Sequence, residues 1–360
     1  HGYAATIGGD IGSFHHNLLA NCYGRNWSMG GGTDANGYYA GRLDIFNNVV
    51  YNWGTRTTDG GAHEVNFVNN YYKMGVDTRL TTLFTINIEG NLKGTQSAYV
   101  SGNIRDNKDG SLSTDKLNDT YRLSIDDGRG SIDWDAFVDA PYFPSYAKIE
   151  SAQEAYKSVL SDVGANLPLS DDTDRRVIKE TLERSYTYVG SKSGIRGEID
   201  NEKDAGGYEL YPEEMRPADF DTDLDGLPDW WEEINGSNVN SAAGDYSDSH
   251  ADNNNDGFSA LEDYLAFMAS PNKILKPGEV TDIDLKAMFA GYTQSPMYTV
   301  DDPQSISHIS GSKLTIAAPS QIGIYPITLT VTDGDGASYT RLLNIAVTQK
   351  EILNIEQTVI

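Results

Sequence analysis

Regularly spaced carboxylates mark residues 221–232 as a candidate metal site. Within these twelve residues, oxygen donors stand at positions 1, 3, 5, 9 and 12, and a glycine stands at position 6. The donors are Asp221, Asp223, Asp225, Asp229 and Glu232. Calcium takes about six to eight oxygen ligands, and the glycine permits the sharp turn that brings such donors around one ion. The spacing predicts an EF-hand-type calcium loop; the alternative is a solvated acidic turn without metal.

A second loop repeats the pattern 31 residues later. Its candidate ligands are Asp252, Asn254, Asp256 and Asp263. Gly257 stands at the sixth position, and the backbone carbonyls of Leu227 and Phe258 would serve at the seventh position of the two loops. The pair resembles the loops of dockerin-like and thrombospondin-type repeats. This resemblance implies structural calcium in a secreted protein and leaves a cohesin-binding role open.

A recurring asparagine organises the first part of the chain. Asn17 is followed by Asn48, Asn70 and Asn103, at spacings of 31, 22 and 33 residues, in similar sequence surroundings. A unit that recurs every few tens of residues is typical of a solenoid. Each unit alternates apolar and polar residues, turns at an Asn corner and resumes with β-branched or aromatic residues. One asparagine per turn at the same corner would form a hydrogen-bonded ladder.

The sequence therefore predicts a mainly β protein, with the coils of a right-handed parallel β-helix over residues 1–127. Glycine-rich stretches at 29–32 and 59–61 are expected to be loops between turns. An antiparallel sandwich with Asn-rich turns is the alternative. Hairpin loops, however, would not keep the asparagine at one position of the strand.

The residues around the first corner resemble those of a known family, the family 1 polysaccharide lyases or pectate lyases. They are Ser13-Phe-His-His-Asn17, then Arg25, then Gly41-Arg-Leu-Asp-Ile-Phe-Asn-Asn48. The resemblance covers about residues 1 to 110. It implies a carbon–oxygen lyase that cleaves polygalacturonate by calcium-assisted β-elimination. In that reaction a base removes the C5 proton next to the uronate carboxylate, and the C4 glycosidic oxygen leaves.

The resemblance assigns the catalytic position to Arg25. A guanidinium is normally always protonated, so it could act as the base only among crowded positive charges. In the less demanding role, Arg25 holds the uronate carboxylate and neutralises charge that grows in the transition state. The alternative without chemistry is an arginine paired to a loop carboxylate.

Four further residues are candidates for substrate binding: His15, His16, Arg42 and Lys73. Arg42 opens the next coil, whereas the family's second arginine comes within a few residues of the first, where this chain has residues 27–29. His15 and His16 are expected to point to opposite faces of one strand, so that at most one faces the substrate. Lys73 follows the third Asn-Asn corner and is equally well read as a solvated lysine.

The family also carries a lysine on the preceding strand, and Tyr3 stands in its place here. Its catalytic calcium ligands come from coils before the arginine. We therefore expect this chain to hold the later part of a lyase domain. The earlier coils are expected in a preceding segment or a partner chain, which would cover the exposed end of the β-helix.

Three more regions are expected after the coils. Residues 128–217 are predicted to be helices and loops that pack along the β-helix, with helices near 151–160 and 174–182. Residues 218–270 hold the two calcium loops. Residues 277–349 resemble an immunoglobulin- or cadherin-like β-sandwich, which serves as a spacer or as a glycan contact. A proline-bounded stretch at 271–277 is predicted as the linker.

Charge and composition narrow the choice of partners. The chain has a net charge of −26, yet residues 1–110 carry eight basic and nine acidic residues, so the acidic excess lies beyond them. Only the first part suits a polyanion, and the lack of clustered Lys and Arg argues against nucleic acid. No apolar run approaches the ~20 residues of a membrane helix. Cys22 is the only cysteine, which excludes an intrachain disulfide. The calcium loops favour a bacterial protein of the periplasm, the cell surface or the medium.

Two other functions remain open. A noncatalytic β-helix on a secreted multidomain protein would bind acidic glycans without cleaving them. A polygalacturonase-type hydrolase would need paired carboxylates on neighbouring coils, and only Asp44 and Glu64 are placed for that role.

Overall fold

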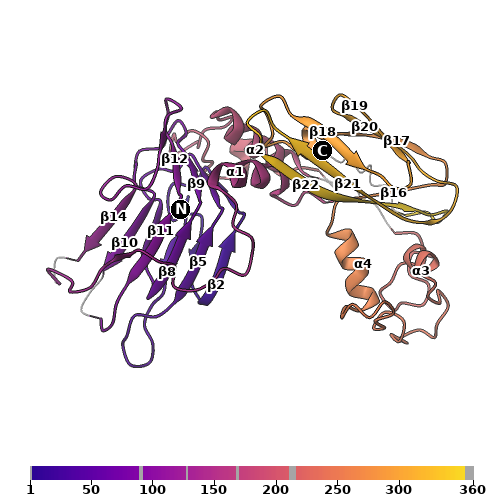
Figure 1. Ribbon diagram of the computed structural model, residues 1–360, viewed down its shortest axis with the longest axis horizontal. Coiled ribbons are helices and arrows are strands. Elements are labelled where there is room, and N and C mark those ends of the chain that lie inside the picture. Colours follow the sequence, from indigo (N-terminus) through magenta and orange to yellow (C-terminus); the bar gives the residue numbers. More distant parts are fainter. Residues whose placement is uncertain (1, 89–91, 127–128, 168–169, 211–215, 353–360) are drawn as a thin grey trace. The chain divides into compact units, whose positions relative to one another are not determined.

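The computed structural model describes residues 2–88, 92–126, 129–167, 170–210 and 216–352 (Figure 1). It is mainly β, with parallel sheets, and divides into two compact units. The first unit comprises His1–Val163 and Asp172–Glu209, and the second comprises Gly164–Asp171 and Leu210–Ile360. The predicted boundary at 127 and 128 lies outside the described residues.

The first unit contains three five-stranded sheets. One consists of β1 (Thr6–Ile7), β4 (Ser28–Gly30), β7 (Thr58–Gly61), β10 (Phe84–Ile88) and β14 (Tyr121–Ile125). The second consists of β2 (Asp10–His15), β5 (Arg42–Phe46), β8 (Glu64–Val68), β11 (Ser97–Ser101) and β15 (Phe137–Val138). The third consists of β3 (Leu18–Ala20), β6 (Val49–Tyr51), β9 (Tyr71–Lys73), β12 (Ile104–Asp106) and β13 (Leu112–Ser113).

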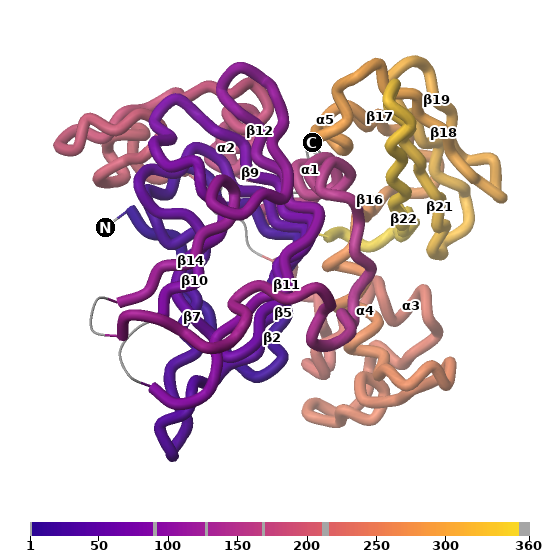
Figure 2. The backbone as a smooth tube through the Cα atoms, turned by 60° about the vertical axis from the view of Figure 1, so that its left-hand side comes forward, coloured from indigo at the N-terminus to yellow at the C-terminus, as the bar shows by residue number. Residues whose placement is uncertain are grey.

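From β1 to β12, strands that follow one another in the chain enter these three sheets in turn, and the neighbours within each sheet are parallel. β13 is the exception, because it stays in the third sheet and pairs antiparallel with β12. Figure 2 shows the sheets as separate walls of the unit. Alternation along each strand sends one set of side chains into the core. On β5 and β8, for example, Leu43 lies level with Val65 and Ile45 with Phe67, and all four are buried.

The predicted asparagine ladder is confirmed. The side-chain Nδ2 of Asn17 donates to Oδ1 of Asn48 at 2.9 Å, Asn48 to Asn70 at 3.0 Å, and Asn70 to Asn103 at 2.9 Å. The residue before Asn48 takes the left-handed backbone that asparagine tolerates, with a φ of 51° at Asn47. The ladder therefore fixes the corner between the second and third sheets on successive turns.

Two helices lie against the third sheet: α1 (Ala152–Asp162) and α2 (Asp172–Glu183). The predicted capping box of α1 is present, because Ser151 accepts from the backbone N–H of Glu154 and the Glu154 carboxylate accepts from Ser151. Ala152 and Val159 of α1 pack on Val49 and Tyr71. A short 3-10 helix, η1 (Glu202–Ala205), follows.

The second unit joins two short helices to a pair of sheets. The helices are α3 (Asp229–Asn235) and α4 (Ala260–Met268). One sheet contains β16 (Asn272–Leu275), β22 (Ser338–Val347), β21 (Gly323–Thr332) and β18 (Met297–Asp301). The other contains β17 (Val280–Asp284), β20 (Lys313–Ala317) and β19 (Ser307–Ser310), with α5 (Leu285–Met288) after β17. Side chains from both sheets share one core.

Two predictions are wrong. The glycine-rich stretches at 29–32 and 59–61 were expected to be loops, but residues 29–30 belong to β4 and residues 59–61 to β7. Residues 272–275 give the second correction. The flanking prolines predicted a linker there, but these residues form β16, which pairs in parallel with β22 from Asn272 to Leu275. Proline at both ends does not prevent a strand between them. None of the described helices combines the length and the apolar character needed to cross a membrane.

Candidate functional site

Arg25 lies in the turn between β3 and β4, and its backbone is held tightly. Its carbonyl accepts the N–H of Ala5 at 3.1 Å, and the next N–H, that of Asn26, donates to Thr57 at 3.1 Å. Asn26 is fully buried, and its Nδ2 donates to the carbonyls of Cys22 at 3.1 Å and Arg56 at 3.3 Å. Buried hydrogen bonds on both sides fix where the Arg25 side chain leaves the turn.

The Arg25 guanidinium has no ion-pair partner among the described residues. Its Cζ lies 4.9 Å from the centre of the Tyr3 ring, and Nη1 approaches Oγ1 of Thr6 at 3.4 Å. Its Nε is buried and forms no hydrogen bond to any described residue. An arginine held by an aromatic face, with its charge not neutralised, is suited to receive an anion. The alternative in which Arg25 serves a loop carboxylate finds no support here.

Arg56 holds the same place one turn later. Ser28 lies level with Asp59 in the β4–β7 pair, which sets Arg25 level with Arg56. Cζ of Arg56 lies 5.8 Å from the same Tyr3 ring. Its Nε and Nη2 donate to the two carboxylate oxygens of Asp59 at 2.7 and 2.6 Å, which raises the pKa of Arg56. The sequence contained a signal for this residue, because the 31-residue step from Asn17 to Asn48 also leads from Arg25 to Arg56.

Arg42 begins β5 in the second sheet and pairs with Asp10. Its Nε and Nη2 donate to the carboxylate at 2.5 and 3.0 Å, and this contact lowers the pKa of Asp10. Both side chains are exposed, so the pair can exchange for another anion at little cost. Arg42 belongs to a different sheet from the strands that flank Arg25 and Arg56.

The two histidines do not point to opposite faces, contrary to the expectation from strand alternation. β2 ends at His15, and His16 takes a left-handed backbone with a φ of 54°, which turns its ring back. The two Nδ1 atoms lie 2.8 Å apart, and the His15 ring stacks on Phe46. Burial and the neighbouring His16 lower the pKa of His15. Nε2 of His16 lies 3.4 Å from the carboxylate of Glu150.

Lys73 ends β9 in the third sheet and is only 8% exposed. Its Nζ donates to the hydroxyl of Tyr156 in α1 at 2.7 Å and to the carbonyl of Leu182 in α2 at 3.0 Å. Burial lowers its pKa to about 8. Lys73 therefore ties both helices to the sheet rather than facing a substrate. The four predicted substrate-binding residues thus lie on the second and third sheets and are not gathered around Arg25.

The carboxylates considered for a hydrolase are not both accessible. Asp44 on β5 is 1% exposed, beside Asn66 and Ser145, and burial raises its pKa. Glu64 on β8 is half-buried, with its Oε1 3.6 Å from Nε2 of His63. A buried Asp44 cannot flank a glycosidic bond, so this pair does not support hydrolysis.

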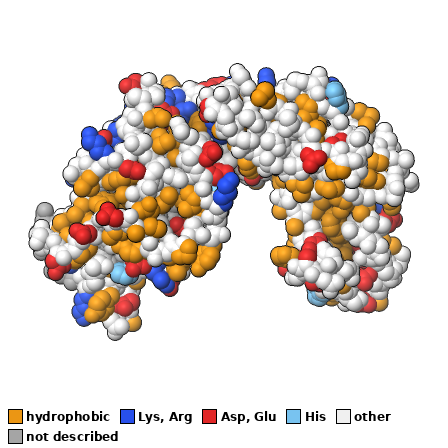
Figure 3. All heavy atoms as spheres, viewed as in Figure 1, with side chains coloured by type: hydrophobic (Ala, Val, Ile, Leu, Met, Phe, Trp, Pro, Cys, Tyr) orange, Lys and Arg blue, Asp and Glu red, His pale blue; other side chains and the backbone are white. Residues whose placement is uncertain are grey.

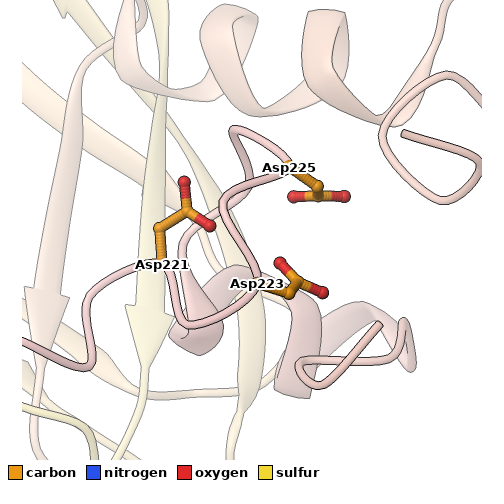
Figure 4. Close-up of side chains that lie close together, drawn as sticks. All are labelled: Asp221, Asp223 and Asp225. Carbon is orange, nitrogen blue, oxygen red and sulfur yellow. The ribbon is translucent and has the colours of Figure 1, made fainter. Parts of the chain in front are cut away.

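The first acidic loop forms the candidate metal centre. One oxygen each of Asp221, Asp223 and Asp225 lies within 4.8 Å of the others, and Figure 4 shows the three carboxyl groups around a common space. Asp223, Asp225 and Glu232 are almost fully buried. Both oxygens of Glu232 and one oxygen of each aspartate are buried and form no hydrogen bond to any described residue. Because buried anions need a counter-charge, these residues fit a cation.

The electrostatics of the loop agree with this reading. Burial, together with Asp223, Asp225, Asp229 and Asp221, raises the pKa of Glu232 to about 8. Asp229, predicted as a ligand, is engaged elsewhere. Its carboxylate accepts from the backbone N–H and the hydroxyl of Thr222, each at 2.8 Å, and lies 3.3 Å from Nζ of Lys350. Asp229 therefore closes the loop at the start of α3.

The second loop has the same backbone as the first. The fourth residue is left-handed in both, with φ of 62° at Leu224 and 59° at Asn255, and the sixth is glycine with φ of 98° and 97°. In both loops the glycine N–H donates to the first aspartate, and the seventh N–H donates to the fifth side chain.

The side chains of the two loops differ. The donors at Asp252, Asn254 and Asp256 are exposed, and Nδ2 of Asn254 donates to Asp256 at 2.9 Å. Asp263 is half-buried, and burial together with Asp256 raises its pKa. Buried carboxylate oxygens without hydrogen-bond partners thus distinguish the first loop from the second. Calcium binding at the second loop stays a prediction from the sequence.

The two helices that follow the loops pack on each other. Trp230 and Trp231 of α3 meet Phe267 of α4 at ring-centre distances of 5.8 and 5.3 Å. Trp230 and Trp231 immediately precede Glu232 in the sequence, so ordering of the first loop is coupled to the packing of α3 on α4.

Acidic and basic side chains are interspersed on the face of the molecule shown in Figure 3. Comparison of the sequence with protein-family models gives no match, and no curated protein matches it significantly.

Proposed function

We propose that the first unit consists of the coils of a right-handed parallel β-helix of the pectate lyase type, and that it acts on polygalacturonate by β-elimination. The observation that carries the proposal is the state of Arg25. This guanidinium stands beside Tyr3, is fixed by the buried Asn26 below it, and has no carboxylate partner among the described residues. The parallel three-sheet arrangement and the Asn ladder support the proposed coil.

Arg25 acts on the uronate whose C5 proton is removed. Its guanidinium receives the carboxylate of that sugar and opposes the negative charge that builds as the C5–H bond breaks. A base accepts the C5 proton, the electrons of the C5–H bond form the C4–C5 double bond, and the C4–O bond breaks, so that the glycosidic oxygen leaves with its electron pair and takes up a proton. Electrostatic stabilisation of this kind is typically worth about a hundredfold or more in rate.

The first acidic loop binds calcium in this proposal. Asp221, Asp223, Asp225 and Glu232 supply the carboxylates, and the metal stabilises the fold of the second unit without taking part in the elimination. Such a loop suits a bacterial protein of the periplasm, the cell surface or the medium, where calcium is plentiful.

The test uses the full-length protein with polygalacturonate and calcium, and it follows the ultraviolet absorbance of the unsaturated product. Wild type is expected to generate absorbance, and Arg25→Gln to reduce the initial rate by at least about a hundredfold. Arg122→Gln is the matched control, since Arg122 is exposed on β14, in the sheet that contains β4, the strand after Arg25. Equal rates in wild type and Arg25→Gln would refute the role of Arg25.

A noncatalytic glycan-binding β-helix is the second candidate. One observation favours it. The lyase reaction of the family uses calcium, but the only cluster of three acidic ligands found among the described residues, Asp221, Asp223 and Asp225, belongs to the second unit rather than to the unit that contains Arg25. Binding of polygalacturonate by the full-length protein without any absorbance change would establish this candidate instead.

A further inference from the structure

We infer that Arg56 and Arg79 bind the uronates next to the one held by Arg25, so that three arginines on three successive turns form a row along which the polymer lies. This inference rests on the proposed function and deepens it, because it names two substrate-binding residues that the resemblance does not supply. We call Arg25, Arg56 and Arg79 the arginine row.

The first step is the relation between Arg25 and Arg56. Both guanidinium groups lie over one ring, that of Tyr3, at 4.9 and 5.8 Å. Tyr3 is 38% exposed, so the place where the two charges meet is open to solvent. Neighbouring strands lie about 4.8 Å apart, which sets the spacing of the two side chains at their backbone.

The second step adds Arg79 on the next turn. The N–H of Gly54 donates to the carbonyl of Tyr23 at 3.1 Å, and the N–H of Arg79 donates to the carbonyl of Gly54 at 3.2 Å. Tyr23, Gly54 and Arg79 are therefore consecutive rungs. Because Tyr23 lies two residues before Arg25 and Gly54 two residues before Arg56, the backbone of Arg79 lies two residues before the position on the third turn that matches Arg25 and Arg56. Arg79 joins the other two through its side chain and the Tyr23 ring.

Gly54 makes the second aromatic contact possible. A Cβ atom at this position would lie 2.3 Å from the Tyr23 ring, so only glycine lets the ring lie across the middle turn. The ring thereby approaches the third turn, where Cζ of exposed Arg79 lies 6.0 Å from its centre. Two tyrosines thus support three guanidinium groups.

Nearby carboxylates do not cancel this positive charge. Asp59 engages only Nε and Nη2 of Arg56, which fixes the plane of the guanidinium and leaves its Nη1 group outside the pair. Asp77 forms its ion pair with Arg196 at 2.8 Å, and Arg79 contributes only a weaker electrostatic part of the lowered pKa of Asp77. No ion pair of Arg25 or Arg79 occurs among the described residues.

The chemistry of the row matches a linear polymer with one carboxylate per sugar. Guanidinium groups recognise carboxylates through paired N–H donors. Guanidinium groups on successive turns, two of them level and the third displaced by two residues, can meet successive carboxylates of a chain that crosses the strands. Methyl esterification removes the negative charge and therefore removes this interaction.

The experiment measures binding to polygalacturonate by affinity electrophoresis with the full-length protein. Arg56→Gln and Arg79→Gln are each expected to weaken binding about fivefold, and the double variant about 20-fold or more. Arg122→Gln is the control and is expected to bind as wild type does. Highly methyl-esterified pectin is expected to bind weakly and equally to all variants, and raising the salt concentration is expected to narrow the differences.

Folding is checked by thermal unfolding of each variant. If Arg56→Gln fails to fold, Arg56→Lys replaces it, because the lysine keeps a positive charge opposite Asp59. Arg79→Gln tests the row independently, because Arg79 is exposed. The inference is overturned if both arginine variants bind polygalacturonate like wild type, or if single-stranded DNA binds as tightly with the same dependence on the arginines.

The outcome separates this inference from the proposed function. If the protein forms the unsaturated product but its affinity for polygalacturonate does not depend on Arg56 and Arg79, the lyase proposal holds and the arginine row is rejected. If binding depends on the arginine row but no unsaturated product forms, the row holds and the lyase activity is rejected.

Discussion

Arg25 and Arg56 stand 31 residues apart in the sequence but hold the same place on adjacent turns, with both guanidinium groups over the ring of Tyr3. Two like charges this close repel each other. The pair of Arg56 with Asp59 offsets part of that repulsion, whereas Arg25 has no carboxylate partner among the described residues. The cluster therefore keeps a positive charge that an external anion can neutralise.

The ring of Tyr3 should matter more for substrate binding than its hydroxyl, which hydrogen-bonds to Arg56. We expect Tyr3→Leu to raise KM for polygalacturonate by about two- to fivefold, because a cation–π contact at an exposed site is worth about 0.5–1 kcal/mol. Tyr3→Phe keeps the aromatic face and is the matched control. Steady-state kinetics would contradict this view if Tyr3→Phe and Tyr3→Leu raised KM equally.

The Asn ladder should carry a large share of the stability of the first unit. Asn70 is fully buried and bonds to both Asn48 and Asn103, so Asn70→Ala leaves several buried polar groups without partners. We expect a loss of about 3 kcal/mol in the free energy of unfolding. Asn17→Ala, at the half-buried end of the ladder, should cost about 1 kcal/mol. Calorimetry that found equal losses would argue against the ladder.

Calcium should stabilise the second unit through Glu232. We expect calcium at a hundred times its Kd to add about 2.7 kcal/mol to the free energy of unfolding of the wild-type unit. Glu232→Gln should lose most of this gain. The neighbouring Glu233→Gln should retain it, because Glu233 is exposed and lies 3.4 Å from Lys350.

Isothermal titration gives the affinity. The calcium-induced change in tryptophan fluorescence that is lost in a Trp230→Phe, Trp231→Phe variant reports the ordering of the loop, because the chain has three further tryptophans. Calcium affinity that is unchanged in Glu232→Gln would exclude the first loop as the site. Because the second loop shares the backbone of the first, Asp256→Asn tests it in the same way.

The burial of Lys73 should make the free energy of unfolding depend on pH. Burial lowers its pKa from 10.5 to about 8, so the folded protein loses this proton at lower pH than the unfolded chain does. Raising the pH from about 8 towards 10.5 should therefore favour folding, by about 3 kcal/mol in total for this group. Lys73→Met should lack this gain. Thermal unfolding of the two proteins across this range checks the difference, and parallel curves would contradict it.

Patterns that depend on neighbours in sequence were predictable. The Asn corners recur in one local setting, and Ser151 with Glu154 forms a capping box within one turn of helix, so both could be inferred from spacing. The first acidic loop also follows from spacing alone, with Asp221, Asp223 and Asp225 gathered as the pattern requires.

Contacts with segments outside the local pattern, and changes of backbone handedness, were not predictable. Lys73 is buried because Tyr156 and Leu182, about 80 and 110 residues later, come to rest on it. Asp229 bonds to Thr222 and to Lys350, which is 121 residues away, instead of serving as a ligand of the first loop. The His16 ring turns towards His15 because His16 takes a left-handed backbone conformation at the end of β2. Local alternation contains none of this information.

The fate of water in the reaction tests the central proposal most directly. An oligogalacturonate of defined length is digested by the full-length protein with calcium in ¹⁸O-labelled water, and the products are weighed by mass spectrometry. An elimination at the uronate held by Arg25 adds no water, so the two product masses should sum to the substrate mass, after correction for exchange of reducing-end oxygen with the labelled water. Arg25→Gln should give neither product. Products whose masses sum to substrate plus one labelled water would show hydrolysis and contradict the account.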